Sequence, residues 1–351
     1  MTYSEIGSEF WQVEPVANDR KYFLSGRTAL DYIIRDMKLK HPEINSVLMP
    51  SYCCDTMMQP IIDNGLTVRF YKVWAENDGF HVQIPGTSNN EAFFLMTYFG
   101  FEMPTGIELE KIRSEWSVII EDRTHSCFRN DNGYENADYS FISYRKWNAF
   151  AGIAEAACIK NFFQEEYSVR TDTRFISLRR SAEKKKKKFI NEGDGDKKEF
   201  LGLFSRAEDE LDKDYRDYGP DIQDCCALAN LDIKSLRTIR QNNARILINV
   251  LKNVNGVRLI YDSVHNDDAP LFLPIYVEKD RDGLRKYLND HDIYCPVHWP
   301  CSEYADRLNN EAIDIYDHEL SLVCDQRYGN EDMEYMASMI RRFYGKKNSF
   351  K

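Results

Sequence analysis

The chain has 351 residues, of which 43% are hydrophobic and 29% are charged, proportions that are ordinary for a globular protein. Its 46 Lys and Arg stand against 57 Asp and Glu, and the resulting net charge of −11 argues against general binding to nucleic acid or to an anionic membrane. No apolar run is long enough for a membrane-spanning helix, and the acidic, aromatic segment 1–15 is unlike a secretory signal. We therefore expect a cytoplasmic protein, and a chain of this length predicts about two domains.

The nine cysteines include two adjacent pairs, Cys53–Cys54 and Cys225–Cys226. Neither pair has the Cys-x-x-Cys spacing of a zinc or redox site, and no histidine cluster accompanies them. We expect buried free thiols and no metal site.

Short apolar runs alternate with helical patterns through the first half of the chain. The runs predict strands at 46–49, 67–73, 92–97, 117–121, 139–143 and 152–159, and the patterns between them predict helices at 27–40, 54–64 and 106–115. This alternation is typical of an α/β fold whose sheet is mostly parallel.

The second half changes in character. The polar segment 181–196 holds five consecutive lysines at 184–188, and because acidic residues surround the run we expect a solvated helix end or loop. Further helices are predicted at 197–214, 227–253, 281–290 and 331–344, and strands at 257–261 and 271–277. We expect a large α/β domain over 1–245, with a helical connection at 160–245, and a smaller α+β domain over 246–351.

Ligands of parallel α/β sheets bind beyond the carboxyl ends of the strands, so the candidate site residues are those that follow each predicted strand. Gly26, Arg27 and Thr28 open a helix, where free backbone amides attract phosphate; Ser-Gly is equally an ordinary helix cap. Asp122 and His125 follow a predicted strand, where they could form a polar site or lie in a surface loop.

Lys146 lies three residues after Ser143, at the end of another predicted strand. Burial and the neighbouring Arg145 would lower the pKa of this lysine, and such a lysine can form a Schiff base. The alternative is an exposed loop lysine. Tyr52 also follows a strand and could stack on a planar ring, although an aromatic at such a position is more often part of the core.

In chain order, the segments SGRTAL, VLMPSYCC, IIEDRTH, FISYRKW and SLVCDQRYGNEDME resemble the DegT/DnrJ/EryC1/StrS family. These are pyridoxal-phosphate enzymes of the aspartate-aminotransferase fold, fold type I, and most are nucleotide-sugar aminotransferases. The resemblance extends from about residue 25 to about residue 336, and it depends on the order and spacing of the motifs.

The resemblance implies pyridoxal 5'-phosphate as the cofactor and assigns roles by position. Lys146 would form the internal aldimine and move the proton at the substrate carbon. Asp122 would face the pyridine nitrogen and keep it protonated, which makes the ring an electron sink. His125 would hydrogen-bond the ring hydroxyl.

The resemblance also assigns the rest of the cofactor site. Ser143 and the amides at Gly26, Arg27 and Thr28 would bind the cofactor phosphate, and Tyr52 would stack on the ring.

Three features depart from the family pattern. The spacing from Ser143 to Lys146 is short, Gly152 stands where the family has a glycine pair, and segment 215–218 only weakly resembles the usual Asn-Tyr-Arg segment. His298 and Trp299 lie where the small domain should meet the site, and they could contact substrate or form a buried turn.

The resemblance therefore predicts an aminotransferase whose acceptor is a keto-sugar, possibly nucleotide-linked, or a smaller amino or keto acid. The alternatives are a pyridoxal-phosphate lyase or dehydratase on the same fold, and a non-catalytic cofactor-binding relative. Lys146 favours transamination, because some dehydratases of the family carry histidine at that position. The family also predicts a homodimer with shared active sites.

Overall fold

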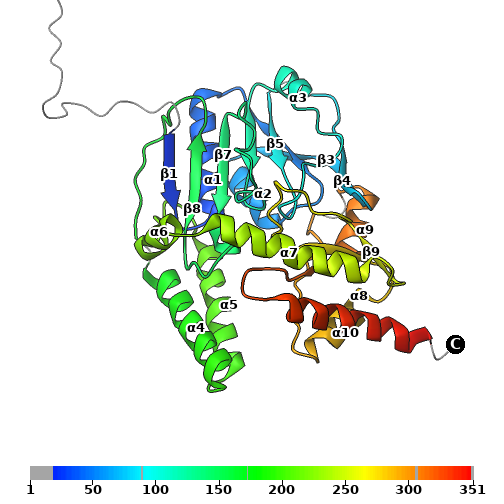
Figure 1. Ribbon diagram of the computed structural model, residues 1–351. Coiled ribbons are helices and arrows are strands. Elements are labelled where there is room, and N and C mark those ends of the chain that lie inside the picture. The colour runs from blue at the N-terminus through cyan, green and yellow to red at the C-terminus, as the bar shows by residue number, and fades with distance from the viewer. Residues whose placement is uncertain (1–18, 88–89, 172, 305–306, 349–351) are drawn as a thin grey trace, which may run out of the picture.

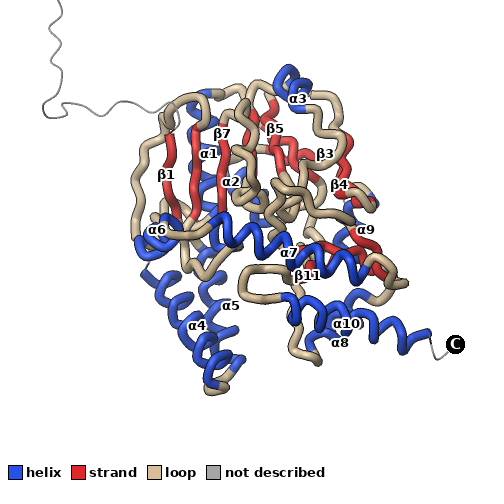
Figure 2. Tube along the Cα trace, viewed as in Figure 1, coloured by secondary structure: helices blue, strands red, loops and turns tan. Residues whose placement is uncertain are grey.

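The computed structural model describes residues 19–87, 90–171, 173–304 and 307–348 (Figure 1). They form one eight-stranded and one three-stranded sheet, with helices around both (Figure 2). The segment 1–15, whose sequence is unlike a secretory signal, lies outside the described residues. Among the described helices, none combines the length and the apolar character needed to cross a bilayer.

The large sheet confirms the predicted α/β class. Its strands are β1 Asp19–Phe23, β2 Ser46–Pro50, β3 Thr67–Glu76, β4 Gly79–Gln83, β5 Glu91–Met96, β6 Ile119–Asp122, β7 Tyr139–Ser143 and β8 Ala154–Cys158, in the order β1-β8-β7-β6-β5-β2-β3-β4. The five strands from β7 to β3 are parallel, whereas β8 and β4 run antiparallel to their neighbours. Strands β2 and β5 are buried along their whole length, which explains their continuous apolar sequences.

Helices α1 Gly26–Lys40, α2 Asp55–Asp63 and α3 Leu109–Glu115 connect these strands. The long helix α1 packs against β1, β7 and β8, and it buries an apolar stripe that includes Leu30, Ile33 and Met37. The hairpin strand β4 and the edge strand β1 were not predicted, because neither has a continuous apolar run.

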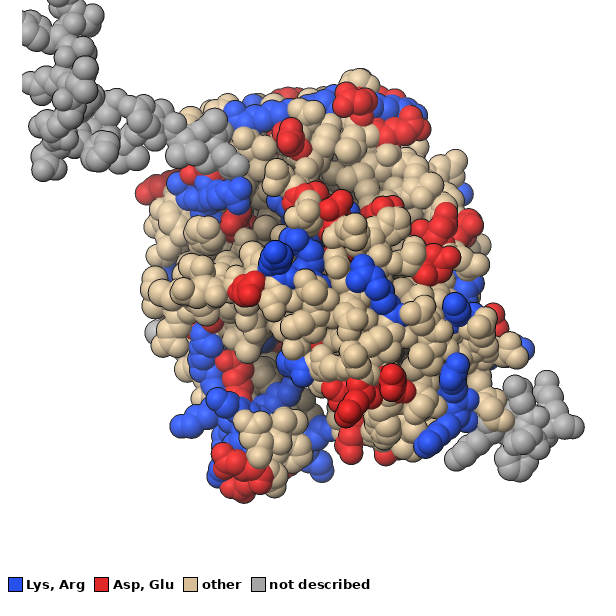
Figure 3. Space-filling view, viewed as in Figure 1, with Lys and Arg blue, Asp and Glu red and all other residues tan. Residues whose placement is uncertain are grey.

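Helices α4 Thr173–Glu192 and α5 Lys197–Lys213 form a hairpin that projects below the large sheet in Figure 1. The five lysines lie inside α4 and are solvated, so the expected helix end or loop was wrong but the expected exposure was right. Lysine is a good helix former, and Lys185 and Lys188 pair with Glu199 and Asp194. Basic and acidic side chains are interspersed over the face shown in Figure 3.

The single helix expected at 227–253 is two helices, α6 Ile222–Ala229 and α7 Ile233–Leu251. Asp232 starts the second one, because its side chain accepts a hydrogen bond from the amide of Ser235 at 2.9 Å. The predicted domain division at residue 245 falls inside α7 and stays a prediction.

The described residues that follow α7 form the antiparallel sheet β11-β10-β9 and three helices. Their bounds are β9 Val257–Leu259, β10 Leu273–Val277, α8 Arg281–Asn289, α9 Asn310–His318, β11 Glu319–Leu322 and α10 Asn330–Asn348. Helix α7 packs on α10.

The nine cysteines, which all lie in the described part of the chain, are free thiols. Only Cys53, Cys158, Cys295 and Cys324 are buried, so burial was expected too broadly.

Gly100 joins the C-terminal segment to the end of β5. It has a φ of +82°, and a Cβ there would lie 1.8 Å from the carbonyl oxygen of Ala269. The amide of Ala269 donates to the Gly100 carbonyl oxygen at 2.9 Å, and the amide of Leu271 donates to that of Phe99 at 2.8 Å. A side chain at residue 100 would break this junction.

We expect Gly100→Ala to lower the free energy of unfolding by about 2 kcal/mol or more, measured by chemical denaturation. The control is Gly202→Ala on α5, where a Cβ would meet nothing within 4 Å. That change should raise stability by roughly 0.5–1 kcal/mol, the usual gain from glycine to alanine in a helix. Equal stability of the two variants would contradict the role of Gly100.

Candidate functional site

Four neighbouring parallel strands, β2, β5, β6 and β7, end at one edge of the large sheet. A pocket lies there, as expected for a parallel sheet. Its described lining residues are Ser25, Gly26, Arg27, Leu30, Cys54, Thr56, Met57, Met96, Asp122, Thr124, His125, Phe141, Ser143, Arg145, Lys146, Glu208, Leu211 and Trp299. Seven residues predicted for the site are thus brought together, while Thr28, Tyr52 and His298 lie outside this lining.

The register of the sheet places the start of α1 beside the end of β7. Phe23 of β1 and Ser143 of β7 both pair with Ala154 of β8, so the three residues lie in one row. The chain then enters α1 at Gly26, where a Cβ would lie 2.9 Å from the Cβ of Ser143. Only glycine fits this approach, and it leaves a small cradle between the backbone of α1 and the end of β7.

Ser25 caps α1 by accepting a hydrogen bond from the amide of Thr28 at 3.2 Å. The Thr28 hydroxyl donates to the carbonyl oxygen of Tyr215 at 2.6 Å. Both polar groups of Thr28 are therefore used inside the protein, which corrects its expected place in the phosphate cradle. Gly26 and Arg27 carry the helix-start amides at the pocket.

Lys146 ends a short 3-10 turn, η1 Tyr144–Lys146, directly after β7. Trp147 anchors this turn by donating from its indole nitrogen to the carbonyl oxygen of Thr124 at 2.7 Å. The Lys146 side chain is exposed into the pocket, yet protein walls surround it. This desolvation lowers the pKa of Lys146 and Arg145 lowers it further, although Cys54 and Asp122 oppose the shift.

His125 lies 3.3 Å from Lys146, measured between Nε2 and Nζ. The Nδ1 atom of His125 accepts a hydrogen bond from the amide of Phe99 at 3.2 Å, so the proton of the neutral ring belongs on Nε2. Burial and the positive charge of Lys146 lower the pKa of His125 well below its ordinary value. Neutral His125 can therefore donate to Lys146, which requires the unprotonated lysine amine.

Asp122 is buried at the end of β6 and accepts a hydrogen bond from the amide of Thr124 at 2.7 Å. Desolvation raises the pKa of Asp122 to about 6, against the lowering effects of Thr124 and Lys146. The group thus ionises only as the pH rises through about 6, and its ionisation costs folding free energy.

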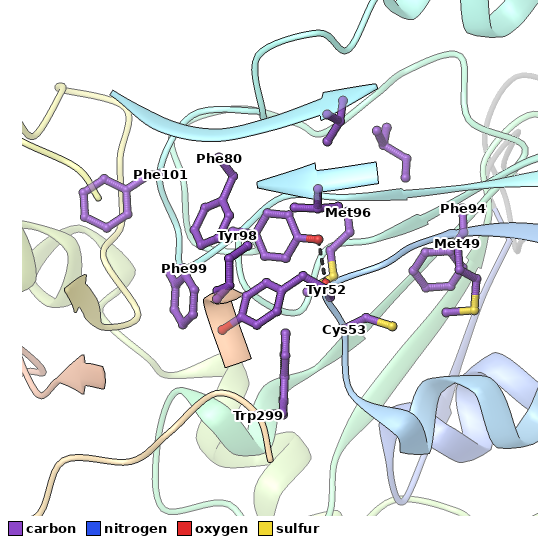
Figure 4. Packing of buried hydrophobic residues seen from close by; sticks show 14 of the residues in the cluster. Met49, Tyr52, Cys53, Phe80, Phe94, Met96, Tyr98, Phe99, Phe101 and Trp299 are labelled. Carbon is purple, nitrogen blue, oxygen red and sulfur yellow. Dashed lines mark hydrogen bonds between the residues drawn. The ribbon is translucent and has the colours of Figure 1, made fainter. Parts of the chain in front are cut away.

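Tyr52 is fully buried in an aromatic cluster (Figure 4). Its ring lies 5.7 Å from Phe80 and 5.1 Å from Trp299 between centroids, and its carbonyl oxygen accepts from the hydroxyl of Tyr98. Its expected stacking on a bound ring is corrected, because it belongs to the core. Trp299 lines the pocket instead, nearly parallel to the ring of His125 at 5.7 Å and 19°.

The two candidate substrate residues are placed differently. The ring of Trp299 lies 5.6 Å from Nζ of Lys146. His298 is held by Ser321, with its Nδ1 atom 2.8 Å from the serine hydroxyl, and it packs on Phe272. His298 is thus fixed next to the pocket by the C-terminal sheet.

Several lining residues were not predicted, among them Thr124, Glu208 and Leu211. Thr124 donates its amide to Asp122 and accepts the amide of Ser143 on its hydroxyl at 3.1 Å, so it couples the two strand ends. Glu208 and Leu211 belong to α5, far along the chain from the strand ends.

Comparison with known proteins supports this architecture. The sugar aminotransferase CalS13 from Micromonospora echinospora matches with a TM-score of 0.61 at 13% identity, over 92% of this chain and 87% of its own. PseC from Helicobacter pylori, an aminotransferase involved in pseudoaminic acid biosynthesis, matches with 0.61 at 13% identity, over 93% and 87%. A DegT/DnrJ/EryC1/StrS aminotransferase from Brucella abortus matches with 0.58 at 15% identity, over 93% and 86%.

No family model matches the sequence, and no curated protein does. These structural neighbours are aminotransferases, one of them of the family that the motifs resemble, and this chain shares their fold. The predicted fold type I is confirmed.

The raised pKa of Asp122 gives a test on the cofactor-free protein. The pKa is about 6 in the folded chain and ~3.9 when unfolded, so the stabilising contribution is complete below pH ~3.9 and is lost as pH rises through 6. Asp122→Asn keeps the acceptor for Thr124 and removes this titration. We expect the variant to gain on the order of 3 kcal/mol relative to the unchanged protein between pH 4 and pH 8.

Chemical denaturation across that pH range measures the difference. A stability difference that stays constant with pH would show that Asp122 titrates like an exposed carboxyl group.

Proposed function

We propose that the protein is a pyridoxal-phosphate-dependent aminotransferase that transfers an amino group to a keto-sugar. The observation that carries the proposal is the convergence of Lys146, Asp122 and the Gly26–Ser143 cradle at one sheet edge. A lysine amine of lowered pKa, a buried carboxyl group and a cradle at a helix start are the three features that this cofactor requires.

The residues present fit the phosphate of the cofactor. A Cβ at residue 26 would fill the cradle, the first turn of α1 has the carboxylate-free sequence GRTA, and the positive end of the helix dipole points there. The buried Nε atoms of Arg27 and Arg145, both residues of the pocket lining, have no hydrogen-bond partner among the described residues. An anion would satisfy these donors.

The residues also fit the ring. Asp122 would hold the ring nitrogen, His125 the ring hydroxyl, and Trp299 would supply the aromatic face expected of Tyr52. When bound, pyridoxal phosphate supplies an electron sink for the charge that develops at the substrate carbon.

Lys146 performs the proton transfer in this proposal. The lowered pKa makes the free electron pair of Nζ more available than that of an ordinary lysine, so Nζ can take the proton from the amine-bearing carbon of the donor and return it to the acceptor. The amide of Phe99 fixes the His125 ring, which leaves the Nε2 proton of His125 for the ring hydroxyl.

Asp122 acts at the ring nitrogen of the cofactor. Once ionised, it stabilises a proton on the ring nitrogen, and the low dielectric of its buried position strengthens that interaction. Thr124 keeps the carboxylate in place by its backbone hydrogen bond.

A second, larger cavity favours a polyhydroxylated substrate. It opens to solvent, shares Arg27 and Thr56 with the pocket, and is lined by polar side chains: Arg27, Asp55, Thr56, Gln59, Asp63, Asp212, Lys213, Asp214, Tyr215, Arg216 and Glu303. Carboxylates and amides are good hydrogen-bonding partners for sugar hydroxyls, and a substrate without hydroxyl groups would not use them.

The proposal includes the homodimer that the resemblance predicts. The larger cavity opens to solvent, and a second copy placed against it would exclude water from the reacting groups.

The test is a single turnover of the cofactor-loaded protein with L-glutamate as donor. We expect 2-oxoglutarate to form in proportion to the protein, followed by amination of a keto-sugar. Asp122→Asn should bind the cofactor but transaminate at least a hundredfold more slowly, a barrier increase of several kcal/mol at roughly 1.4 kcal/mol per tenfold.

Asp131→Asn, at a carboxylate that pairs with Arg129 outside the pocket, is the matched control and should keep full activity. Release of ammonia or water without 2-oxoglutarate would instead identify a lyase or dehydratase. Cofactor binding without any reaction would identify a non-catalytic relative.

A further inference from the structure

Two arginines share one carboxylate at the wall of the pocket. Glu208 of α5 accepts from Arg145 of η1 at 3.0 Å and from Arg179 of α4 at 2.9 Å, on the same oxygen, Oε1. A third cation, Arg27, also acts on Glu208, although its own ion pair is with Asp212 at 2.8 Å. Asp212 is 61% exposed, so water weakens that pair.

This cluster has more donors than acceptors. The Nε atoms of Arg145 and Arg179 are buried and, within the described part of the chain, unpartnered. Burial lowers the pKa of Arg179, and the charge of Arg145 lowers it further, which shows that the two cations repel each other. Burial alone would raise the pKa of Glu208, but Arg145 and Arg179 together hold it below its ordinary value.

Aromatic rings hold the guanidinium groups in place. Phe175, which is fully buried, lies 5.3 Å from the guanidinium carbon of Arg145 and 5.8 Å from that of Arg179. Phe204 of α5 lies 5.2 Å from the guanidinium carbon of Arg179. The rings therefore hold both guanidinium groups beside Glu208 before any ligand arrives.

The two arginines differ in their access to the pocket. Arg145 lies two residues after Ser143 and lines the pocket together with Glu208, whereas Arg179 is outside the described lining. Arg145 can thus turn from Glu208 to a ligand while Arg179 keeps Glu208 neutralised.

We propose that Arg145 binds a phosphate group in this pocket. Glu208 competes with that phosphate for the guanidinium group of Arg145, and Arg179 weakens the competition because it also pairs with Glu208. Phosphate is the matching ligand because guanidinium groups bind it through charge-assisted hydrogen bonds, and the cradle at Gly26 and Ser143 lies beside Arg145 in the same lining. The phosphate can come from the cofactor, in which case the inference rests on the proposed function, or from a nucleotide-linked substrate.

The experiment measures equilibrium affinities of the full chain for pyridoxal phosphate, pyridoxal, inorganic phosphate and uridine diphosphate. Glu208→Gln removes the competitor and should tighten the binding of pyridoxal phosphate about tenfold, while pyridoxal, which has no phosphate, binds as before. Arg145→Gln should weaken pyridoxal phosphate by a similar factor and leave pyridoxal unchanged.

Arg179 provides the sharpest test, because it is expected to act only through Glu208. In Arg179→Gln, Arg145 is the remaining arginine that pairs with Glu208, so the affinity for pyridoxal phosphate should fall several-fold. In the double variant Arg179→Gln with Glu208→Gln this loss should disappear, and the affinity should equal that of Glu208→Gln. If Arg179 had only a structural role, the double variant would bind pyridoxal phosphate more weakly than Glu208→Gln does.

Glu210→Gln is the matched control on the same helix. It removes the same charge from a carboxylate that pairs with Arg174 and Lys213, and it should change no affinity. Arg179→Lys, which keeps the charge, serves if Arg179→Gln fails to fold.

The outcomes separate this inference from the proposed function. Changes in the affinity for uridine diphosphate but not for pyridoxal phosphate would assign the phosphate to the substrate. Unchanged affinities for all three phosphate-bearing probes would overturn the inference even if the protein transaminates. A protein that binds no pyridoxal phosphate, but whose affinity for inorganic phosphate follows the predicted order of variants, would refute the proposed function and support this site.

Discussion

The close approach of α1 to the end of β7 is the constraint on which the site depends. It follows from the antiparallel strand β8, which pairs with β1 on one side and β7 on the other and brings Phe23 and Ser143 into one row. The chain then has room for glycine alone at residue 26. A helix start, a serine and the turn that carries Lys146 therefore meet at one place, although they come from distant parts of the sequence.

Burial then determines the protonation of the groups gathered there. Lys146, His125 and Asp122 lie on adjacent strand ends, and desolvation disfavours the charged form of each. Burial favours the neutral histidine, lowers the pKa of the lysine and raises that of the aspartate to about 6, so it opposes charge at the centre of the pocket. The positive charges are concentrated at its wall instead, at Arg27 and Arg145.

The sequence predicted those parts of the site that local patterns determine. Strands ending at polar residues, such as 117–121 before Asp122, identified the sheet edge, and the order of motifs identified the fold. Thr28 and Tyr52 were misplaced because local sequence does not distinguish an exposed helix-start amide from a capped one, or a pocket aromatic from a core aromatic. Arg145 and Glu208 are 63 positions apart, and no local sequence pattern predicts a contact over that separation.

The central claim is that Lys146 is the residue to which pyridoxal phosphate becomes covalently attached. Borohydride reduction of the protein after incubation with pyridoxal phosphate, followed by peptide mapping with mass spectrometry, tests it most directly. We expect one cofactor-derived group per chain, on the peptide that contains Lys146, and none in Lys146→Ala. Labelling spread over surface lysines such as those at 184–188, with Lys146 unmodified, would contradict it.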